Sequence, residues 1–142
     1  MQLTLPLNIE IPSSPTDFYL GLMFRESLEQ DSGMFFVFEE SGEKSFHMKD
    51  TTIPLDVAFI NKDGIIESIK ELEPLNVIPV YSDADVLYAL EVNRGWFVEH
   101  NVKVGDKIFL GCYYFNFSYC ICIFCTTISF FKRTSLNRRS KI

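Results

Sequence analysis

The spacing of apolar residues along the first 110 positions predicts a series of short strands. Between Leu3 and Ile11 every second residue is apolar, a period that is typical of a strand with one buried face. Pro6 and Pro12 place this strand at a sheet edge, because proline has no N–H to donate to a neighbouring strand. The run from Met34 to Phe38 is apolar on both faces and predicts a central strand. Further strands are expected at residues 45–48, 55–60, 65–72, 86–92 and 107–110.

Turn and helix signals separate these strands. Residues 14–17 (Ser-Pro-Thr-Asp) are typical of a helix start, and Gly21 is well placed to end that short helix. Asn-Lys-Asp-Gly at 61–64 indicates a hairpin turn, residues 74–85 a long loop, and residues 96–100 a second short helical segment. The whole pattern predicts a mainly β fold, a compact antiparallel sandwich or barrel of about seven short strands with two short helices.

Charge is distributed unevenly along the chain of 142 residues, whose formal net charge is −6. All nineteen acidic residues and eight of the thirteen basic ones precede Ile108, so this part carries −11 and the remainder +5. An acidic surface repels phosphate backbones, which excludes nucleic acid as a partner. The length is that of a single domain that can bury a sizeable core.

The cysteines all lie in the C-terminal part, at Cys112, Cys120, Cys122 and Cys125. The rest of the chain has none, so no disulfide framework supports it, which suits a reducing compartment. The N-terminus lacks the basic and apolar regions of a secretory signal, and we expect a cytoplasmic protein. The cysteine spacing resembles part of a metal pattern, but it lies in an apolar aromatic run, and the two histidines are not spaced as ligands. We expect neither a metal nor another cofactor.

Among the charged or titratable side chains that interrupt the apolar runs between Gly21 and Ile60, five are candidates for a site. They are Arg25, His47, Lys49, Asp50 and Asp56. Such side chains need partners among aliphatic and aromatic residues, so we take these five as candidate ligand-binding residues. Arg25 presents a planar fork suited to a carboxylate or phosphate, and with Lys49 it can hold a small anionic or polar ligand that Asp56 helps to orient. In the structural alternative, Asp56 pairs with Arg25 or Lys49 and only fixes a loop to the sheet.

His47 raises the question of catalysis, because imidazole titrates near neutral pH and serves as a general acid or base. No serine or cysteine nucleophile stands out near it in the sequence. The sequence therefore assigns no catalytic residue and no reaction.

The ordered motifs of this chain resemble those of the family called domain of unknown function 192. The resemblance is carried by the runs at 21–25, 33–34, 46–49, 53–60, 90–92 and 104–107. It covers roughly residues 3–110 and implies a compact mainly β domain with peripheral helices and no established reaction. The family pattern usually has Trp where this chain has His47, and Asn where it has Asp50. If the family binds a ligand at this segment, these two changes predict a different ligand, or none, in this chain.

The C-terminal segment permits three interpretations. The 24 residues from Ile108 to Phe131 carry no charge, and five basic residues follow. A helix of this length spans about 36 Å and can cross a bilayer core of about 30 Å, so residues 108–131 can form a membrane anchor with a positive flank. Residues 108–110 fit the last strand better, however, and no Leu, Ala, Val or Gly occurs between Cys112 and Phe131. An extension without a selected role and a segment packed in the core or on a partner are the alternatives.

These observations divide the chain into a β domain, residues 1–110, and an extension, residues 111–142. Three functions stay open. The first is a binding or accessory module for a small polar or anionic ligand or a protein partner. The second is an enzyme of unassigned reaction that uses the neighbourhood of Arg25, His47, Lys49 and Asp56. The third is an accessory protein anchored to a membrane by its C-terminal segment.

Overall fold

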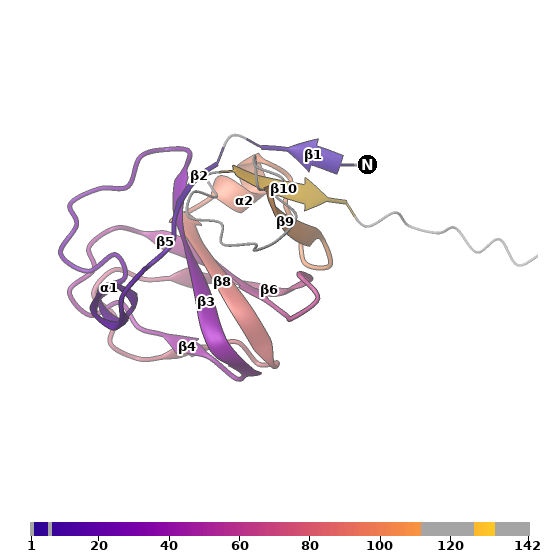
Figure 1. The fold of residues 1–142 in the computed structure, drawn as a ribbon. Helices are drawn as coiled ribbons and strands as arrows, with labels where there is room; N and C mark the ends of the chain where they lie inside the picture. Colours follow the sequence, from indigo (N-terminus) through magenta and orange to yellow (C-terminus); the bar gives the residue numbers. More distant parts are fainter. Residues whose placement is uncertain (1, 6, 112–126, 133–142) are drawn as a thin grey trace, which may run out of the picture.

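The computed structural model describes residues 2–5, 7–111 and 127–132, and it is mainly β, as predicted (Figure 1). Its helices are α1 (Pro15–Leu20) and α2 (Trp96–Glu99). Its strands are β1 (Gln2–Thr4), β2 (Asn8–Glu10), β3 (Ser32–Gly42), β4 (Ser45–Phe46), β5 (Leu55–Ile60), β6 (Ile66–Leu72), β7 (Val80–Tyr81), β8 (Val86–Asn93), β9 (Lys107–Gly111) and β10 (Thr127–Phe131). In the described part of the chain they form three sheets, ordered β1-β10-β9, β2-β3-β8-β5-β6 and β4-β7.

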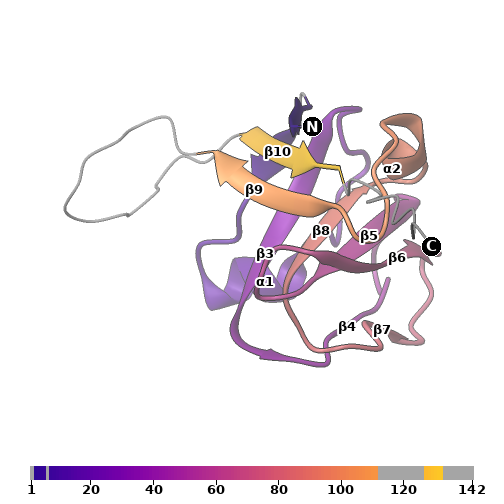
Figure 2. The same ribbon diagram turned by 90° about the vertical axis from the view of Figure 1, so that its right-hand side faces the viewer.

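The five-stranded sheet is the centre of the fold. Its strands pair antiparallel except for β2 and β3, which are parallel. This sheet is open, with β2 and β6 at its edges, and the sheet of β1, β10 and β9 packs against one of its faces (Figures 1 and 2). Of the two predicted architectures, the sandwich describes the structure and the closed barrel does not.

The strand predicted over residues 3–11 is divided between two sheets. β1 pairs with β10, whereas β2 pairs with β3. Between them the amide of Leu7 donates to the carbonyl of Leu5 at 2.9 Å. Both strands lie at sheet edges, as the prolines predicted. The alternation is also confirmed, since Leu5, Leu7 and Ile9 are all buried.

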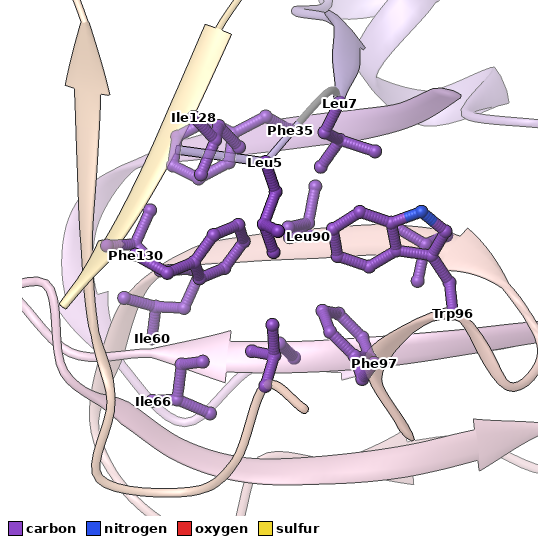
Figure 3. Close-up of a cluster of buried hydrophobic side chains, with 14 of the residues drawn as sticks. Leu5, Leu7, Phe35, Ile60, Ile66, Leu90, Trp96, Phe97, Ile128 and Phe130 are labelled. Carbon is purple, nitrogen blue, oxygen red and sulfur yellow. The ribbon is translucent and has the colours of Figure 1, made fainter. Parts of the chain in front are cut away.

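The first hydrophobic core fills the space between the two larger sheets (Figure 3). Trp96 and Phe97 of α2 enter it from one side, and Ile128 and Phe130 of β10 enter it from another. Neither Ile128 nor Phe130 has any exposed surface. Residues beyond position 110 therefore belong to the same core as the preceding strands. An ion pair of 2.7 Å between Lys132 and the buried Asp106 joins the end of β10 to the turn before β9.

The second hydrophobic core lies on the opposite face of the five-stranded sheet, under α1 and the segment from β4 to β5. Helix α1 begins and ends as predicted. The Ser14 hydroxyl accepts from the Asp17 amide at 3.1 Å, and Gly21, with φ of 50°, follows the last helical residue. These two ends direct Phe18 onto β3, where its ring meets that of Phe36 at a centroid distance of 5.4 Å.

Two strands have no counterpart among the predicted elements. β7 lies within the predicted loop 74–85 and pairs with β4, and β10 lies in the segment considered for a membrane anchor. Residues 112–126 of that segment, which include all four cysteines, are outside the described residues. Its described ends pair with each other as the antiparallel strands β9 and β10. Within the ranges that the structure describes, no helix is long and apolar enough to cross a membrane.

Candidate functional site

A cavity of about 250 Å³ opens beside α1 on the face of the sheet that holds the second core. Its walls come from α1, β3, β4, β5, β8 and the turns next to α1 and β4. The polar side chains among the lining residues are those of Tyr19, Ser45, His47, Thr51 and Glu91. The remaining lining residues are apolar apart from a glycine. The cavity is therefore an apolar recess with few polar groups, the usual character of a small-molecule site.

Four phenylalanines make the aromatic part of the wall, and we call them the phenylalanine cluster. They are Phe18, Phe36, Phe38 and Phe46. Each ring contacts two others, with centroid distances between 5.0 and 6.3 Å and interplanar angles between 68° and 89°. Such edge-to-face contacts fix the orientation of every ring. The wall is thus preformed rather than assembled around a ligand.

Glu91 is the unusual residue of this site. It lies in the central strand β8, paired with Met34 on one side and Val57 on the other, and only 4% of its surface is exposed. Within the described residues no hydrogen bond or ion pair of its carboxyl group is found, and the group borders the cavity rather than being sealed inside the core. Because burial penalises the charged form, the pKa of Glu91 rises to about 8. The side chain is therefore mostly a neutral acid at pH 7.

Glu91 is not among the five site residues predicted from the sequence. The alternation of Val86, Tyr88, Leu90 and Val92 predicts a strand with one apolar, buried face. A glutamate between two of these residues then lies on the opposite face, which such a strand exposes to solvent. The second core covers that other face, so Glu91 is buried. The signal that could have found it is its place in the motif Leu90-Glu91-Val92, an acidic residue within a strand of the family pattern.

His47 is one of the five predicted site residues, and it lines the cavity. Its side chain is exposed at the mouth, just after β4. Its Nδ1 atom accepts a hydrogen bond from the backbone amide of Lys49 at 3.3 Å, so this tautomer carries its proton on Nε2. Thr51, a buried neighbour, also lines the cavity and donates to the carbonyl of Lys49 at 3.1 Å.

Arg25 is occupied by another partner. Its guanidinium donates two hydrogen bonds to the carboxylate of Glu10 on β2, at 2.7 and 2.8 Å. These hydrogen bonds raise the pKa of Arg25 and lower the pKa of Glu10. The expected partners of Arg25 were Asp56 or a ligand, so this pairing differs from both alternatives.

Lys49 and Asp50 are exposed and lie in a turn. The carbonyl of Asp50 accepts from the amide of Phe24 at 2.8 Å, which brings the turn next to the segment that carries Arg25. Asp50 has a φ of 53°, a conformation in which Asn and Asp are enriched among residues other than glycine. The change from the family's usual Asn to Asp therefore keeps a residue that suits this backbone.

Asp56 is buried and supports the start of α2. Its Oδ2 atom accepts from the amide of Gly95 at 2.8 Å, whereas Oδ1 is buried without a hydrogen bond. Burial is the main reason why the pKa of Asp56 is raised, and the hydrogen bond from the Gly95 amide is the main effect that opposes this rise. Arg94 donates to the carbonyl of Leu72 at 2.9 Å and pairs with Glu73. Of the five predicted residues, only His47 therefore lines the cavity.

No metal centre is present among the residues that the structure describes, where no group of three His, Cys, Asp or Glu side chains is arranged to hold an ion. The cysteine pattern at 120–125 lies outside those residues.

Comparison with known proteins places the chain in a family without assigning a reaction. No curated protein matches it. One solved structure, a candidate transcription regulator from Sinorhizobium meliloti 1021, is 35% identical, with a TM-score of 0.68 over 71% of this chain and 79% of that one. A protein of unknown function from Novosphingobium aromaticivorans DSM 12444 is 30% identical, with a TM-score of 0.67 over 71% of this chain and 73% of that one. Residues 2–110 match the family described as "Uncharacterized ACR", DUF192, and the chain therefore belongs to the DUF192 family.

Proposed function

We propose that this protein is a binding module for a small, mainly apolar molecule that occupies the cavity beside α1 and contacts Glu91. One observation carries the proposal. A carboxyl group that is almost fully buried lines a preformed apolar cavity, and it has no partner among the described residues.

A buried polar group without a hydrogen bond destabilises a fold, by about 1–3 kcal/mol in mutational studies. A carboxyl group placed in the middle of a central strand is therefore a poor choice for stability alone. A ligand that exchanges a hydrogen bond or a charge with Glu91 supplies the missing partner. Strongly raised pKa values of this kind are concentrated at functional sites.

The size and lining of the cavity limit the ligand. A volume of about 250 Å³ lies just below the usual range for ligand sites, about 300–1,000 Å³, so the occupant is a small molecule. The contacts of this site do not favour the small anionic ligand that the sequence suggested. Its proposed anchor Arg25 is paired with Glu10, and a second negative charge beside Glu91 would be repelled once that group ionises.

The same contacts favour binding over catalysis. Arg25 and Asp56 each have a structural partner away from the cavity, which is the arrangement expected of a non-enzymatic module. If the chain acts in transcription, as the description of one solved relative suggests for that protein, its acidic body makes a ligand or a protein a better partner than DNA.

A fragment screen tests this function. Ligand-observed NMR is carried out on the wild-type protein, on Ser45→Trp and on Ser41→Trp. Ser45 lines the mouth of the cavity and is exposed, so an indole ring there obstructs entry, whereas Ser41 is an exposed serine outside the lining. We expect fragments that bind the wild type and Ser41→Trp and are lost from Ser45→Trp. Equal binding to all three proteins, or no binding to any, contradicts the proposal.

A further inference from the structure

We infer that the cavity recognises an organic cation, and this inference rests on the proposed function. The cation is an alkylated ammonium group held between the phenylalanine cluster and the carboxylate of Glu91. Three independent features of the described residues lead to this ligand class.

The first feature is the aromatic wall. The face of a phenyl ring carries negative electrostatic potential, and an ammonium group within about 6 Å of a ring centroid is attracted to it. The phenylalanine cluster borders one cavity with four such rings, and Tyr19 adds a fifth aromatic side chain. Alkylated ammonium groups suit such a wall best, because their methyl groups contact the rings while the charge stays weakly hydrated.

The protein already places a cation on one of these rings. Lys44 Nζ lies 5.0 Å from the ring centroid of Phe38. Lys44 is not among the residues that line the cavity, so its ammonium group does not fill the site. The contact shows that a ring of the cluster accepts a cation on its side away from the cavity lining.

The second feature is the counter-charge. Glu91 can supply one carboxylate to the cavity, and no lysine or arginine is among the lining residues. The other titratable side chains that face the cavity are Tyr19 from α1 and His47 after β4. The neighbouring strands β3 and β5 present only Phe36, Phe38 and Leu55. An incoming cation therefore meets an unopposed acid.

The third feature is the field of the whole domain. The part of the chain before Ile108 has nineteen acidic residues against eight basic ones. Such an excess of negative charge raises the local concentration of cations and lowers that of anions. The domain thus favours the approach of the same ligand class that its cavity can hold.

Binding of a cation must be coupled to release of a proton. Glu91 is protonated in the empty cavity below a pH of about 8, and the ion pair requires its charged form. The affinity for a cation is therefore expected to fall about tenfold for each pH unit below 8, and to level off above it. A neutral ligand of the same shape requires no such ionisation.

Choline and 3,3-dimethylbutan-1-ol provide the test, because the second molecule replaces the nitrogen of the first by carbon and removes the charge. Isothermal titration calorimetry on the full chain is performed from pH 6 to pH 9 in two buffers of different ionisation enthalpy. We expect choline to bind the wild type at least tenfold more tightly than the alcohol at pH 8, and to release close to one proton at pH 7.

Three variants test which side chains cause the preference for choline and its dependence on pH. Glu91→Gln is expected to weaken choline binding at least tenfold and to leave the alcohol unchanged. Phe18→Leu, which keeps an apolar side chain, is expected to weaken choline more than the alcohol. His47→Gln removes the imidazole that also lines the cavity and is expected to preserve the pH profile.

The outcomes separate this inference from the proposed function. If the alcohol binds as well as choline, or if choline binds with no dependence on pH, the ligand class is wrong and the cavity remains a binding site. If choline does not bind but screened fragments do, the conclusion is the same. If neither probe nor any fragment binds, both proposals fail.

Discussion

Replacing Glu91 by glutamine should stabilise the protein, and by an amount that depends on pH. The substitution keeps the shape of the side chain and removes its ability to ionise. Burial raises the pKa of Glu91 from 4.5 to about 8, so between these two values the unfolded chain has lost a proton that the folded chain still holds. Stability therefore falls as pH rises through this window, and the glutamine variant lacks that loss.

The size of the effect follows from the two pKa values. At 1.36 kcal/mol per pKa unit, ionisation favours the unfolded wild-type chain by about 1 kcal/mol at pH 5 and by about 3 kcal/mol at pH 7. Above pH 8 the penalty levels off at about 5 kcal/mol. Because a typical domain has only about 5–15 kcal/mol of stability, these differences are large. The amide and the neutral acid carry similar burial costs, so the pH-dependent part is expected to dominate.

Urea denaturation followed by Trp96 fluorescence measures the difference, since Trp96 is the chain's single tryptophan and is buried. The experiment is carried out without ligand at pH 5 and pH 7 and at equal ionic strength. Glu40→Gln, an exposed change on β3, is the control and should leave stability nearly unchanged at both values. The reasoning is refuted if the free energies of unfolding of Glu91→Gln and wild type differ by the same amount at pH 5 and pH 7. It is also refuted if the variant is less stable than the wild type at pH 7.

Three further substitutions test other parts of the structure. Arg25→Met removes an ion pair whose side chains are 38% and 55% exposed. Because solvent screens such a pair, the free energy of unfolding should fall by about 0.5–1 kcal/mol, and by less in high salt. Urea titrations at low and high salt measure this fall, and a value above about 2 kcal/mol contradicts a surface role. Phe130→Ala leaves a cavity at a fully buried position of the first core and should lower the free energy of unfolding by about 3–5 kcal/mol. A melting curve like that of the wild type would contradict the packing of β10 in this core. Asp56→Ala leaves the Gly95 amide without its acceptor and should cost about 1–3 kcal/mol, whereas Asp56→Asn keeps an acceptor and should cost less; equal losses in urea titrations would contradict this role.

Local patterns predicted most of the elements because their causes are local. The cap at Ser14, the glycine at 21 and the turn at 61–64 act through neighbouring residues, and the structure has them where they were expected. The choice of sheet is not local. The single alternation between Leu3 and Ile11 gives no sign that its two halves join different sheets, since their partners lie far away in the sequence.

The candidate site could be predicted only in part for the same reason. The charges at Arg25 and Asp56 were correctly expected to need partners, but those partners, Glu10 and the Gly95 amide, come from segments that only the fold brings near. Glu91 was overlooked because one-faced alternation describes a strand of a sheet covered on one side. The sheet here is covered on both sides, and this coverage turns an ordinary glutamate into a buried acid.

Glu91 is a buried acid in the wall of the proposed binding cavity, with no partner among the described residues. The most direct measurement is a ¹³C NMR titration of the Glu91 side-chain carboxyl in the free protein, with the resonance assigned by its absence from Glu91→Gln. The structure predicts a midpoint at a pH of about 8, well above the ordinary glutamate value of 4.5. A midpoint near 4.5 would show that water or another group already satisfies this carboxyl, and it would contradict the account.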